Sequence, residues 1–373
     1  MRKINYSVLF LMGCSGILQA NGINDNQVFI SDSRTYFFYH ALPYGTQVNY
    51  NPMNVIINGG YGILQIPQSI STEYGRKIFD YPYTEWGENV WQTVGHPIET
   101  INEFGWRRFI TTELFPLTLN MQGNQWVPNY FLHVIGGGLH FRATEEWFRF
   151  HGFSAPRMWS IGTMVAYHAL SEIVENHGNE DLTVDHLADL LIFDPVGMVL
   201  FANDGVCRFF SEKLNLAEWS MQPAINLANG NLENMGQFYV AKYPVTSNRR
   251  WNLMVHFGLH GMAGVSHQWS EGRFLSLTGG FLVEDLVEIE PGGGERTLRG
   301  VLTWRVGIFY DLNNSLLASL MVSNVAENRV RLNIYPGVLR LGGFSPGFFL
   351  SGDQEWVVGL YVSFLPVGGA WGR

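Results

Sequence analysis

The stretch WNLMVHFGLHGMAGVSHQW, residues 251–269, alternates between two kinds of side chain. One set is apolar or small: Trp251, Leu253, Val255, Phe257, Leu259, Gly261, Ala263, Val265 and Trp269. The other is polar or glycine: Asn252, His256, Gly258, His260, Gly264, Ser266 and Gln268. A period of two sends the sets to opposite faces of a β-strand. Tryptophan at both ends of the apolar face is typical of the aromatic girdle of a membrane barrel.

Further alternating segments follow this stretch and are separated by turn residues, at 274–287, 298–310, 315–325, 329–335, 338–350 and 356–365. Consecutive strands joined by short turns form an antiparallel meander, and closing the meander removes edges that lipid cannot hydrate. We therefore predict a mainly β fold with a helical insertion: an antiparallel meander β-barrel of about 8–12 strands, given that single-chain bacterial barrels usually have an even count. Residues 235–365 would hold the barrel strands and 366–373 a C-terminal tail.

The composition agrees with this fold. Charged residues make up 15% of the chain, aromatic residues 14%, and there are 42 glycines. Soluble domains have roughly 25% charged residues. A membrane barrel needs apolar residues only at every second position, so it lacks long apolar runs. A soluble, aromatic-rich β protein is the alternative, and the net charge of -9 argues against a nucleic-acid partner.

The N-terminus has the features of an export signal. Arg2 and Lys3 precede an apolar stretch, and Ala20 offers a small residue for cleavage, so residues 1–20 are predicted to be a signal peptide. The alternative is a lipobox around Cys14, which would then be lipidated. Both interpretations export the protein, and removal of the signal leaves Cys207 as the single cysteine, which excludes an intrachain disulfide.

The middle of the chain has helical spacing, and helices are expected between residues about 83 and 213. Helical segments are predicted at 83–94, 98–115, 158–176, 183–193 and 194–203, with Ser154 and Pro156 marking the start of the third. Strand-like alternation is predicted at 55–66 and in part at 130–141. The expected organisation is an N-terminal region at 21–128 with a strand and helices, followed by a strand plus helical insertion at 129–215.

Candidate functional residues gather on two of these helices. His168, Glu172 and Glu175 are spaced by four and three and share a helix face, and the next helix carries Asp185 and Asp189. If the helices form a hairpin, these side chains could bind a divalent cation. The alternative is a hydrogen-bonded network, since no compact motif such as H-E-x-x-H is present. No other cofactor is predicted.

A hydrolytic site is a further alternative on the same helix. Ser171 follows His168 by three residues, so a weak catalytic set of His168, Ser171 and Glu172 is available for lipid hydrolysis. No nucleophile elbow accompanies it.

Histidines and glycines elsewhere have simpler interpretations. In one continuous strand His256 and His260 would lie roughly 13 Å apart, too far for one metal, so they are predicted to face the lumen. Three consecutive glycines, Gly136 to Gly138, lack the spacing of a nucleotide-binding loop and indicate close packing or a bend.

Residues 129–201 resemble an uncharacterised domain family of bacterial outer-membrane-associated envelope proteins. The resemblance rests on Asn129-Tyr130-x-x-His133 with Gly136-Gly137, Arg149-x-x-Gly152-x-Ser154, Ser160, Glu172 and Glu175, Asp185-x-x-x-Asp189-Leu190 and Pro195-Val196-Gly197. It departs at Val134, where the family pattern leads us to expect proline. The resemblance implies an envelope location and singles out His133, Glu172 and Asp189, but it transfers no reaction.

The leading functional expectation is a non-enzymatic protein of the bacterial outer membrane, with a helical insert and a structural or small-ligand passage role. Its partners would be outer-membrane lipid and a small hydrophobic ligand, and the oligomeric state is left open. The alternatives are a barrel-borne lipid hydrolase or acyl-modifying enzyme, and a soluble periplasmic lipoprotein.

Overall fold

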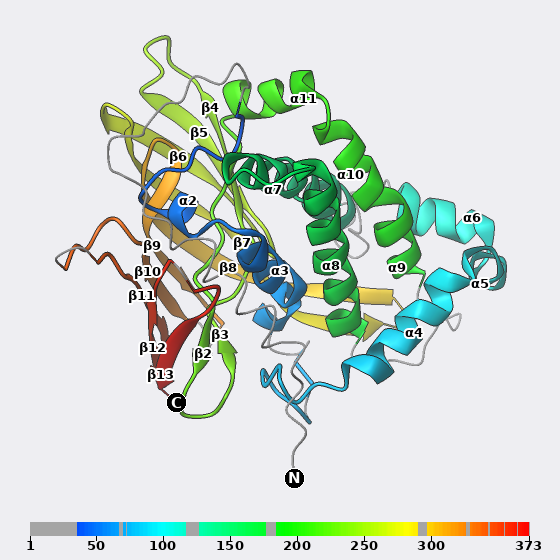
Figure 1. Cartoon of the computed structure of the whole chain (residues 1–373). Coiled ribbons are helices and arrows are strands. Elements are labelled where there is room, and N and C mark those ends of the chain that lie inside the picture. Colours follow the sequence, from blue (N-terminus) through cyan, green and yellow to red (C-terminus); the bar gives the residue numbers. More distant parts are fainter. Residues whose placement is uncertain are drawn as a thin grey trace.

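The computed structural model describes residues 36–66, 70–71, 73–116, 127–176, 184–289, 297–325, 329–341, 344–353, 355–363 and 365–372. The predicted signal peptide at 1–20, with Cys14, and the predicted helix start at Thr183 lie outside these residues. The chain forms a mixed α/β structure in which a helical region at about 46–213 precedes a large, mostly antiparallel meander sheet. Figure 1 shows the helices from residue 83 onward gathered on one side of the sheet.

The helical region contains short α-helical, 3-10 and π-helical pieces around two longer α-helices. Its elements are α2 (Thr46–Asn49), α3 (Pro52–Gly60), η1 (Gly62–Gln65), α4 (Tyr83–Gly95), α5 (Pro97–Phe104), α6 (Trp106–Phe109), η3 (Ile110–Leu114), η4 (Val127–Gly137), α7 (Gly138–Phe150), α8 (Pro156–Asn176), α9 (Asp185–Ala188), η5 (Asp189–Phe193), α10 (Asp194–Phe201), α11 (Asp204–Arg208) and η6 (Phe209–Lys213). The predicted helices at 83–94, 98–115, 158–176 and 194–203 are confirmed, and the last two begin at prolines or directly before one.

The strand predictions at 55–66 and 130–141 are wrong, because both segments are helical. In the first, the Asn51 side chain accepts a hydrogen bond from the Asn54 N–H at 2.9 Å, and Pro52 fills the first helical position of α3. These start signals outweigh an alternation of only a few residues. The second segment forms η4 and the start of α7, and its glycines are packed closely.

The predicted packing role of the glycine run is confirmed at two positions. A Cβ added to Gly136 would lie 2.6 Å from the Tyr239 ring, and one added to Gly138 would lie 2.3 Å from the Phe201 ring. Only glycine lets these backbones approach so closely.

None of the described helices is by itself long and apolar enough to cross a membrane. Asp185–Phe201 and Asp204–Lys213 meet the criteria of length and composition when taken together, with a bend of 81° between them.

The sheet contains thirteen strands in the order β1-β4-β5-β6-β7-β8-β9-β10-β11-β12-β13-β2-β3. Their bounds are β1 (Ala217–Glu218), β2 (Ala224–Asn226), β3 (Leu232–Glu233), β4 (Tyr239–Pro244), β5 (Trp251–Phe257), β6 (His260–Ser270), β7 (Arg273–Ile289), β8 (Thr297–Leu312), β9 (Ser315–Ser323), β10 (Val330–Ile334), β11 (Gly347–Gly352), β12 (Trp356–Tyr361) and β13 (Gly368–Gly372). All pairings are antiparallel except the one between β13 and β2. The meander is thus confirmed.

Thirteen strands exceed the predicted range, and the paired order ends at β1 and β3 without closing into a barrel. The number of strands is high because two segments of the chain are each divided into two strands. Residues 217–226 hold β1 and β2, and residues 232–244 hold β3 and β4. The two segments are also hydrogen-bonded to each other in the stretches between these strands. The Trp219 N–H donates to the Phe238 carbonyl, and the Met221 N–H donates to the Gly236 carbonyl. The two ends of the sheet therefore belong to a single hairpin.

The predicted tail at 366–373 is also not a tail, because β13 lies within it. Gly369 pairs with Leu360 of β12 and with Ile225 of β2. The sequence of this strand is too rich in glycine to show alternation.

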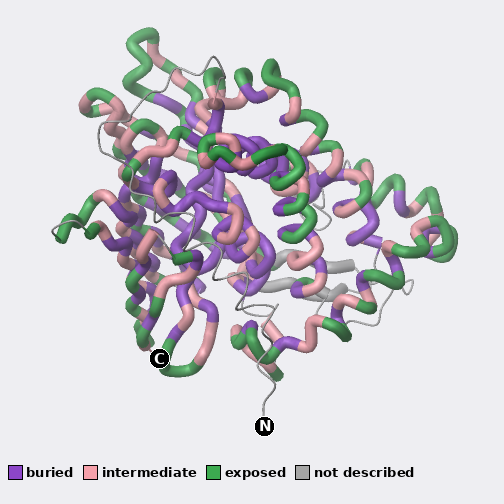
Figure 2. Tube along the Cα trace, viewed as in Figure 1, coloured by how far each residue is buried: buried purple, intermediate pink, exposed green. Residues whose placement is uncertain are grey.

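Residues 251–269 do not form one continuous strand as predicted. The chain reverses between Phe257 and His260, so that β5 and β6 are a hairpin with His256 paired to Met262. The prediction that His256 and His260 lie 13 Å apart is therefore wrong: His256 Nδ1 is 2.5 Å from His260 Nε2. The assignment of the two faces is confirmed, because Leu253 and Val255 are exposed whereas His256 and Met262 are buried. Figure 2 shows this alternation along the strands.

Two cores hold the layers together. The buried face of the sheet packs on itself around Trp219, Phe238, Met254 and Phe309. The helical region packs against the opposite face of β4 and β5, where Tyr239 joins Phe141 and Tyr167 in a second cluster. The helices therefore cover part of the face that is otherwise exposed.

The carboxylate of Glu146 on α7 anchors the first described residues. It accepts backbone N–H bonds from Phe37, Phe38 and Tyr39, each at 2.9 Å, and it pairs with Arg142 at 2.9 Å. The Glu146 side chain is fully buried.

We predict that Glu146→Ala lowers the free energy of unfolding by about 3–5 kcal/mol, because it leaves three N–H groups without their acceptor and removes the buried carboxylate that pairs with Arg142, whose other ion pair is with the exposed Asp204. Urea unfolding in detergent would measure it. The matched control is Glu212→Ala, which removes the exposed i,i+4 pair with Arg208; it should cost at most about 1 kcal/mol. Equal losses for the two variants would contradict the anchoring role.

Candidate functional site: a buried cluster of histidines and carboxylates

The candidate site lies where four helical elements meet. His133 belongs to the π-helical η4, His168 to the middle of α8, Asp189 begins η5 and Asp194 begins α10. The wider π-helical turn occurs frequently at functional sites because it redirects side chains within a continuous helix. Here two such turns, η4 and η5, supply a histidine and a carboxylate to the same point.

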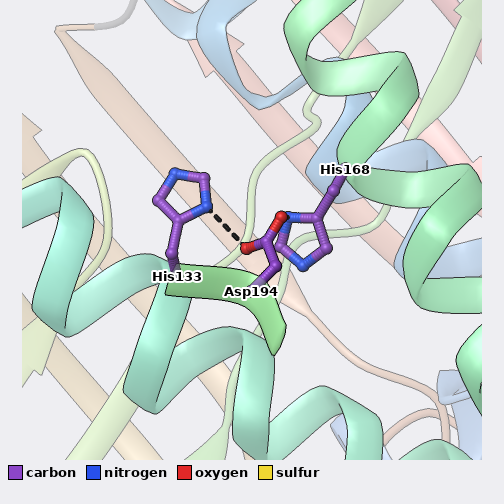
Figure 3. Close-up of side chains that lie close together, drawn as sticks. All are labelled: His133, His168 and Asp194. Carbon is purple, nitrogen blue, oxygen red and sulfur yellow. Dashed lines mark hydrogen bonds and ion pairs between the residues drawn. The ribbon is translucent and has the colours of Figure 1, made fainter. Parts of the chain in front are cut away.

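Asp194 sits between two imidazole rings, as Figure 3 shows. Its Oδ1 lies 2.9 Å from Nδ1 of His133, and its Oδ2 lies 3.1 Å from Nδ1 of His168. The other nitrogen of His133, Nε2, lies 3.5 Å from Oδ2 of Asp189. The two rings have centroids 5.5 Å apart. His133 thus has a carboxylate at each of its ring nitrogens.

A second pair extends the cluster along α8. Glu172 lies one turn from His168 and its Oε2 is 2.5 Å from Nδ1 of His186. Further out, the carboxyl groups of Asp185 and Glu113 interact with each other. The cluster therefore runs from α8 through α9 to η3.

The two central histidines differ in proton affinity. Burial by itself would lower the pKa of His133, but the carboxylates of Asp189 and Asp194 outweigh it and raise this pKa well above its usual value. Burial lowers the pKa of His168 to about 4, and Asp194 offsets only part of this effect. His133 is therefore the charged partner and His168 the neutral one at neutral pH.

The carboxyl groups of the cluster also differ in the direction in which their pKa is shifted. Burial alone would raise the pKa of Glu172, but the bond from His186 lowers it. Burial raises the pKa of Asp189 well above its usual value, against the opposing effect of His133. Burial together with Asp185 raises the pKa of Glu113 to about 7. Neighbouring groups pushed in opposite directions are characteristic of functional sites, although structural ion-pair networks produce them too.

Several buried polar atoms of the cluster lack a hydrogen bond of acceptable geometry among the described residues. They are both ring nitrogens of His168, Oδ1 of Asp189, Oδ2 of Asp194, Oδ1 of Asp185 and Oε2 of Glu113. Buried polar atoms are normally satisfied, so each such atom calls for a physical reason.

The structure brings together His168, Glu172 and Asp189 from the predicted set. Glu175 is exposed at the end of α8, and Asp185 turns toward Glu113 instead of His133. Ser171 is half-buried and makes no hydrogen bond to His168, so the predicted nucleophile and base are not paired.

Sequence reasoning missed Asp194 and His186 as members of the site. Asp194 precedes Pro195, and this pair was interpreted only as a helix boundary. His186 directly follows Asp185, and no spacing rule linked it to Glu172. A signal was available in both cases, since each is a titratable residue within a segment already rich in acidic residues.

The remaining residues of the family-like motif have structural roles. The Asn129 amide donates to the Glu113 carbonyl at 3.0 Å, and the Tyr130 hydroxyl donates to the Leu114 carbonyl at 2.5 Å. Arg149 pairs with the buried Glu145, and Gly152 has a φ of 75°, which favours glycine. These contacts hold η4 against η3 and turn the chain between α7 and α8.

We predict opposite pH effects for His168→Gln and His133→Gln on stability without added metal. The His168 pKa is depressed, so its contribution is present above about pH 6.5 and is lost as the pH falls through about 4. The advantage of wild type over His168→Gln should thus shrink by about 3 kcal/mol over this window.

The His133 pKa is raised, so its contribution is present below about pH 6.5 and is lost as the pH rises. The advantage of wild type over His133→Gln should therefore grow on acidification. Both predictions are tested by urea unfolding of the wild type and the two variants in detergent with a chelator, measured at several pH values across this range. Parallel pH profiles for the two variants would refute the assignment of charged and neutral rings.

Comparison of the chain with family models, curated proteins and solved structures finds no match. The resemblance of residues 129–201 to an envelope family therefore stays a prediction, and the argument about function depends on the site and the sheet.

Proposed function

We propose that the protein is embedded in the bacterial outer membrane through the exposed face of its sheet and has a structural role there. The observation that carries the proposal is one row of paired residues that crosses ten neighbouring strands, β4 to β13. Every member is apolar or tyrosine and none is buried: Tyr243, Leu253, Val265, Leu277, Ile308, Leu320, Leu332, Leu350, Val358 and Trp371. We call this set the apolar row.

An exposed apolar band of this extent is unfavourable in water and is what hydrocarbon requires. Leu277 is 57% exposed and Ile308 46% exposed, although they are paired in the centre of the sheet. Contiguous exposed apolar surfaces mark interaction or membrane sites. Exposed tryptophans, Trp251, Trp269 and Trp356, stand at strand ends, where the indole N–H would meet the membrane interface.

The opposite face of the same strands is buried and carries polar and charged side chains beside the apolar cluster around Trp219 and Phe309. The Lys242 ammonium lies 2.6 Å from the Asp311 carboxylate, and the Arg305 guanidinium donates to Nδ1 of His260 at 2.8 Å. A membrane barrel has this arrangement of apolar outside and polar inside. The hairpin of residues 217–244 holds both ends of the sheet.

The interior contacts favour a structural role over an open passage. Residues 44–65, here called the bracing segment, bond to several strands at the buried side. The Gln47 N–H donates to Ser315 Oγ at 3.2 Å, the Asn54 amide to the Tyr361 hydroxyl at 3.2 Å, and Arg331 Nη1 to Gln65 Oε1 at 3.3 Å. A segment that ties β9, β10 and β12 together braces the sheet from within.

Passage of a small ligand remains a second candidate because of one cavity. It has a volume of about 680 Å³ and is lined in part by Phe38, Gln47, Lys242, Asn252 and Phe274. The cavity is lined by both polar and apolar groups. This lining suits a ligand with polar groups better than the small hydrophobic ligand that we expected from the sequence. The lipid-hydrolase alternative has less support, because Ser171 and His168 are not paired.

Fractionation distinguishes membrane insertion from a soluble lipoprotein. We expect the protein to stay with outer membranes through high-salt and alkaline washes and to migrate differently in gel electrophoresis before and after boiling. Release by high salt alone would refute the embedded sheet.

A charge placed in the apolar row should block assembly. We predict that Leu277→Arg removes the heat-modifiable form, because arginine at the membrane midplane of a barrel costs about 2–4 kcal/mol. The matched control, Glu271→Arg, puts the same charge on the exposed turn of the same hairpin and should assemble normally. Normal assembly of both variants would count against lipid contact at the row.

A further inference from the structure

We propose that His133, His168 and Asp194 bind one divalent cation of the zinc class. Each residue offers one ligand atom, and these atoms lie within 4.8 Å of one another. Two imidazoles and one carboxylate are the ligand types of zinc sites that keep a further position for water, whereas Mg²⁺ and Ca²⁺ prefer oxygen ligands alone.

The distances between ligand atoms suit a tetrahedral ion. Ligands bound at about 2.0–2.1 Å in a tetrahedron are about 3.3 Å apart. The nitrogen of His133 and that of His168 lie 2.9 Å and 3.1 Å from the nearest Asp194 oxygens. These two contacts run to different oxygens of Asp194, and the atoms that could hold one ion lie within 4.8 Å of one another. Rotation of the side chains would have to bring them to tetrahedral separations.

The state of His168 is an independent sign of a ligand. The residue is 2% exposed, it faces Asp194 in Figure 3, and neither of its ring nitrogens makes a hydrogen bond of acceptable geometry among the described residues. Nδ1 has only the 3.1 Å contact with Asp194 Oδ2 among the described residues, and a buried ring nitrogen without a hydrogen bond is costly in a metal-free network. An ion bound to Nδ1 of His168 and to Asp194 Oδ2 would satisfy two of the unpaired atoms at once.

The surroundings supply what ligating histidines usually have. The second nitrogen of His133 faces the Asp189 carboxylate at 3.5 Å, as in the carboxylate–histidine–metal arrangement that orients such rings. The described cluster also has more carboxyl groups than imidazoles: Glu113, Glu172, Asp185, Asp189 and Asp194 surround His133, His168 and His186.

The ion would have a structural consequence as well. Its three ligands come from η4, α8 and α10, which are far apart in sequence and enter the cluster from different directions. These elements also pack through the cluster that includes Val134 and Phe193. Metal binding to the folded state should add to this packing and raise the thermal stability of the helical region.

The test uses the full-length protein, folded in detergent and stripped with a chelator. Zinc binding is measured by calorimetry and by metal analysis after dialysis, and Co²⁺ serves as a spectroscopic probe of a tetrahedral site. We expect one tightly bound zinc per chain, a rise in Tm, a tetrahedral Co²⁺ spectrum and much weaker binding of Mg²⁺.

Two variants and one control locate the site. His168→Gln and Asp194→Asn should each weaken zinc binding by more than the 10–100-fold typical of losing an outer partner. The control is His96→Gln, which alters an exposed His–Glu pair whose atoms are 3.0 Å apart; it should bind like wild type.

Absence of saturable zinc binding by the wild type, unchanged affinity in both cluster variants, or equal affinity for Mg²⁺ would overturn the proposal in favour of a metal-free hydrogen-bonded network. If both variants fail to fold, the stoichiometry, thermal shift and Co²⁺ spectrum of the wild type decide the question alone.

Discussion

The strict separation of two faces on the sheet is the constraint on which the rest of the structure depends. The antiparallel register aligns Leu253, Val265, Leu277 and Ile308 across four strands, so one slip by a single residue would turn polar side chains outward and apolar ones inward. Such a slip would also bring the buried Lys242 and Asp311 out of contact. The proposed contact with lipid, the polar interior and the bracing segment all follow from this register.

The helical region is fitted to the sheet by packing and by a few buried polar bonds. Tyr239 inserts against Gly136, where a side chain larger than hydrogen would collide with its ring. Glu146 then holds the chain that leads into the bracing segment. Through these contacts the position of the helices depends on β4, and the position of the bracing segment depends on the helices.

The same arrangement creates the cluster around His133. Once α8 lies beside η4 and α10, His168 and the carboxyl groups of Asp189 and Asp194 are buried and interact with one another and with the partly exposed His133. Both ring nitrogens of His168 lack a hydrogen bond of acceptable geometry, and the proposed cation would bind one of them.

Periodicity alone determined the meander and its faces, because a side chain in a strand can point only to one side or the other. It also determined α8, whose proline start and helical spacing are local features. Local alternation wrongly predicted strands at 55–66 and 130–141. Both segments are helical, because of the cap at the start of α3 in the first and the close packing of glycines in the second. The hairpin turn at Gly258, the strand β13 and the meeting of both sheet ends on residues 217–244 depended on pairing between distant segments. For the site, helical spacing linked His168 with Glu172, but only tertiary packing could bring His133 and Asp194 to them, since no spacing rule connects residues 61 positions apart.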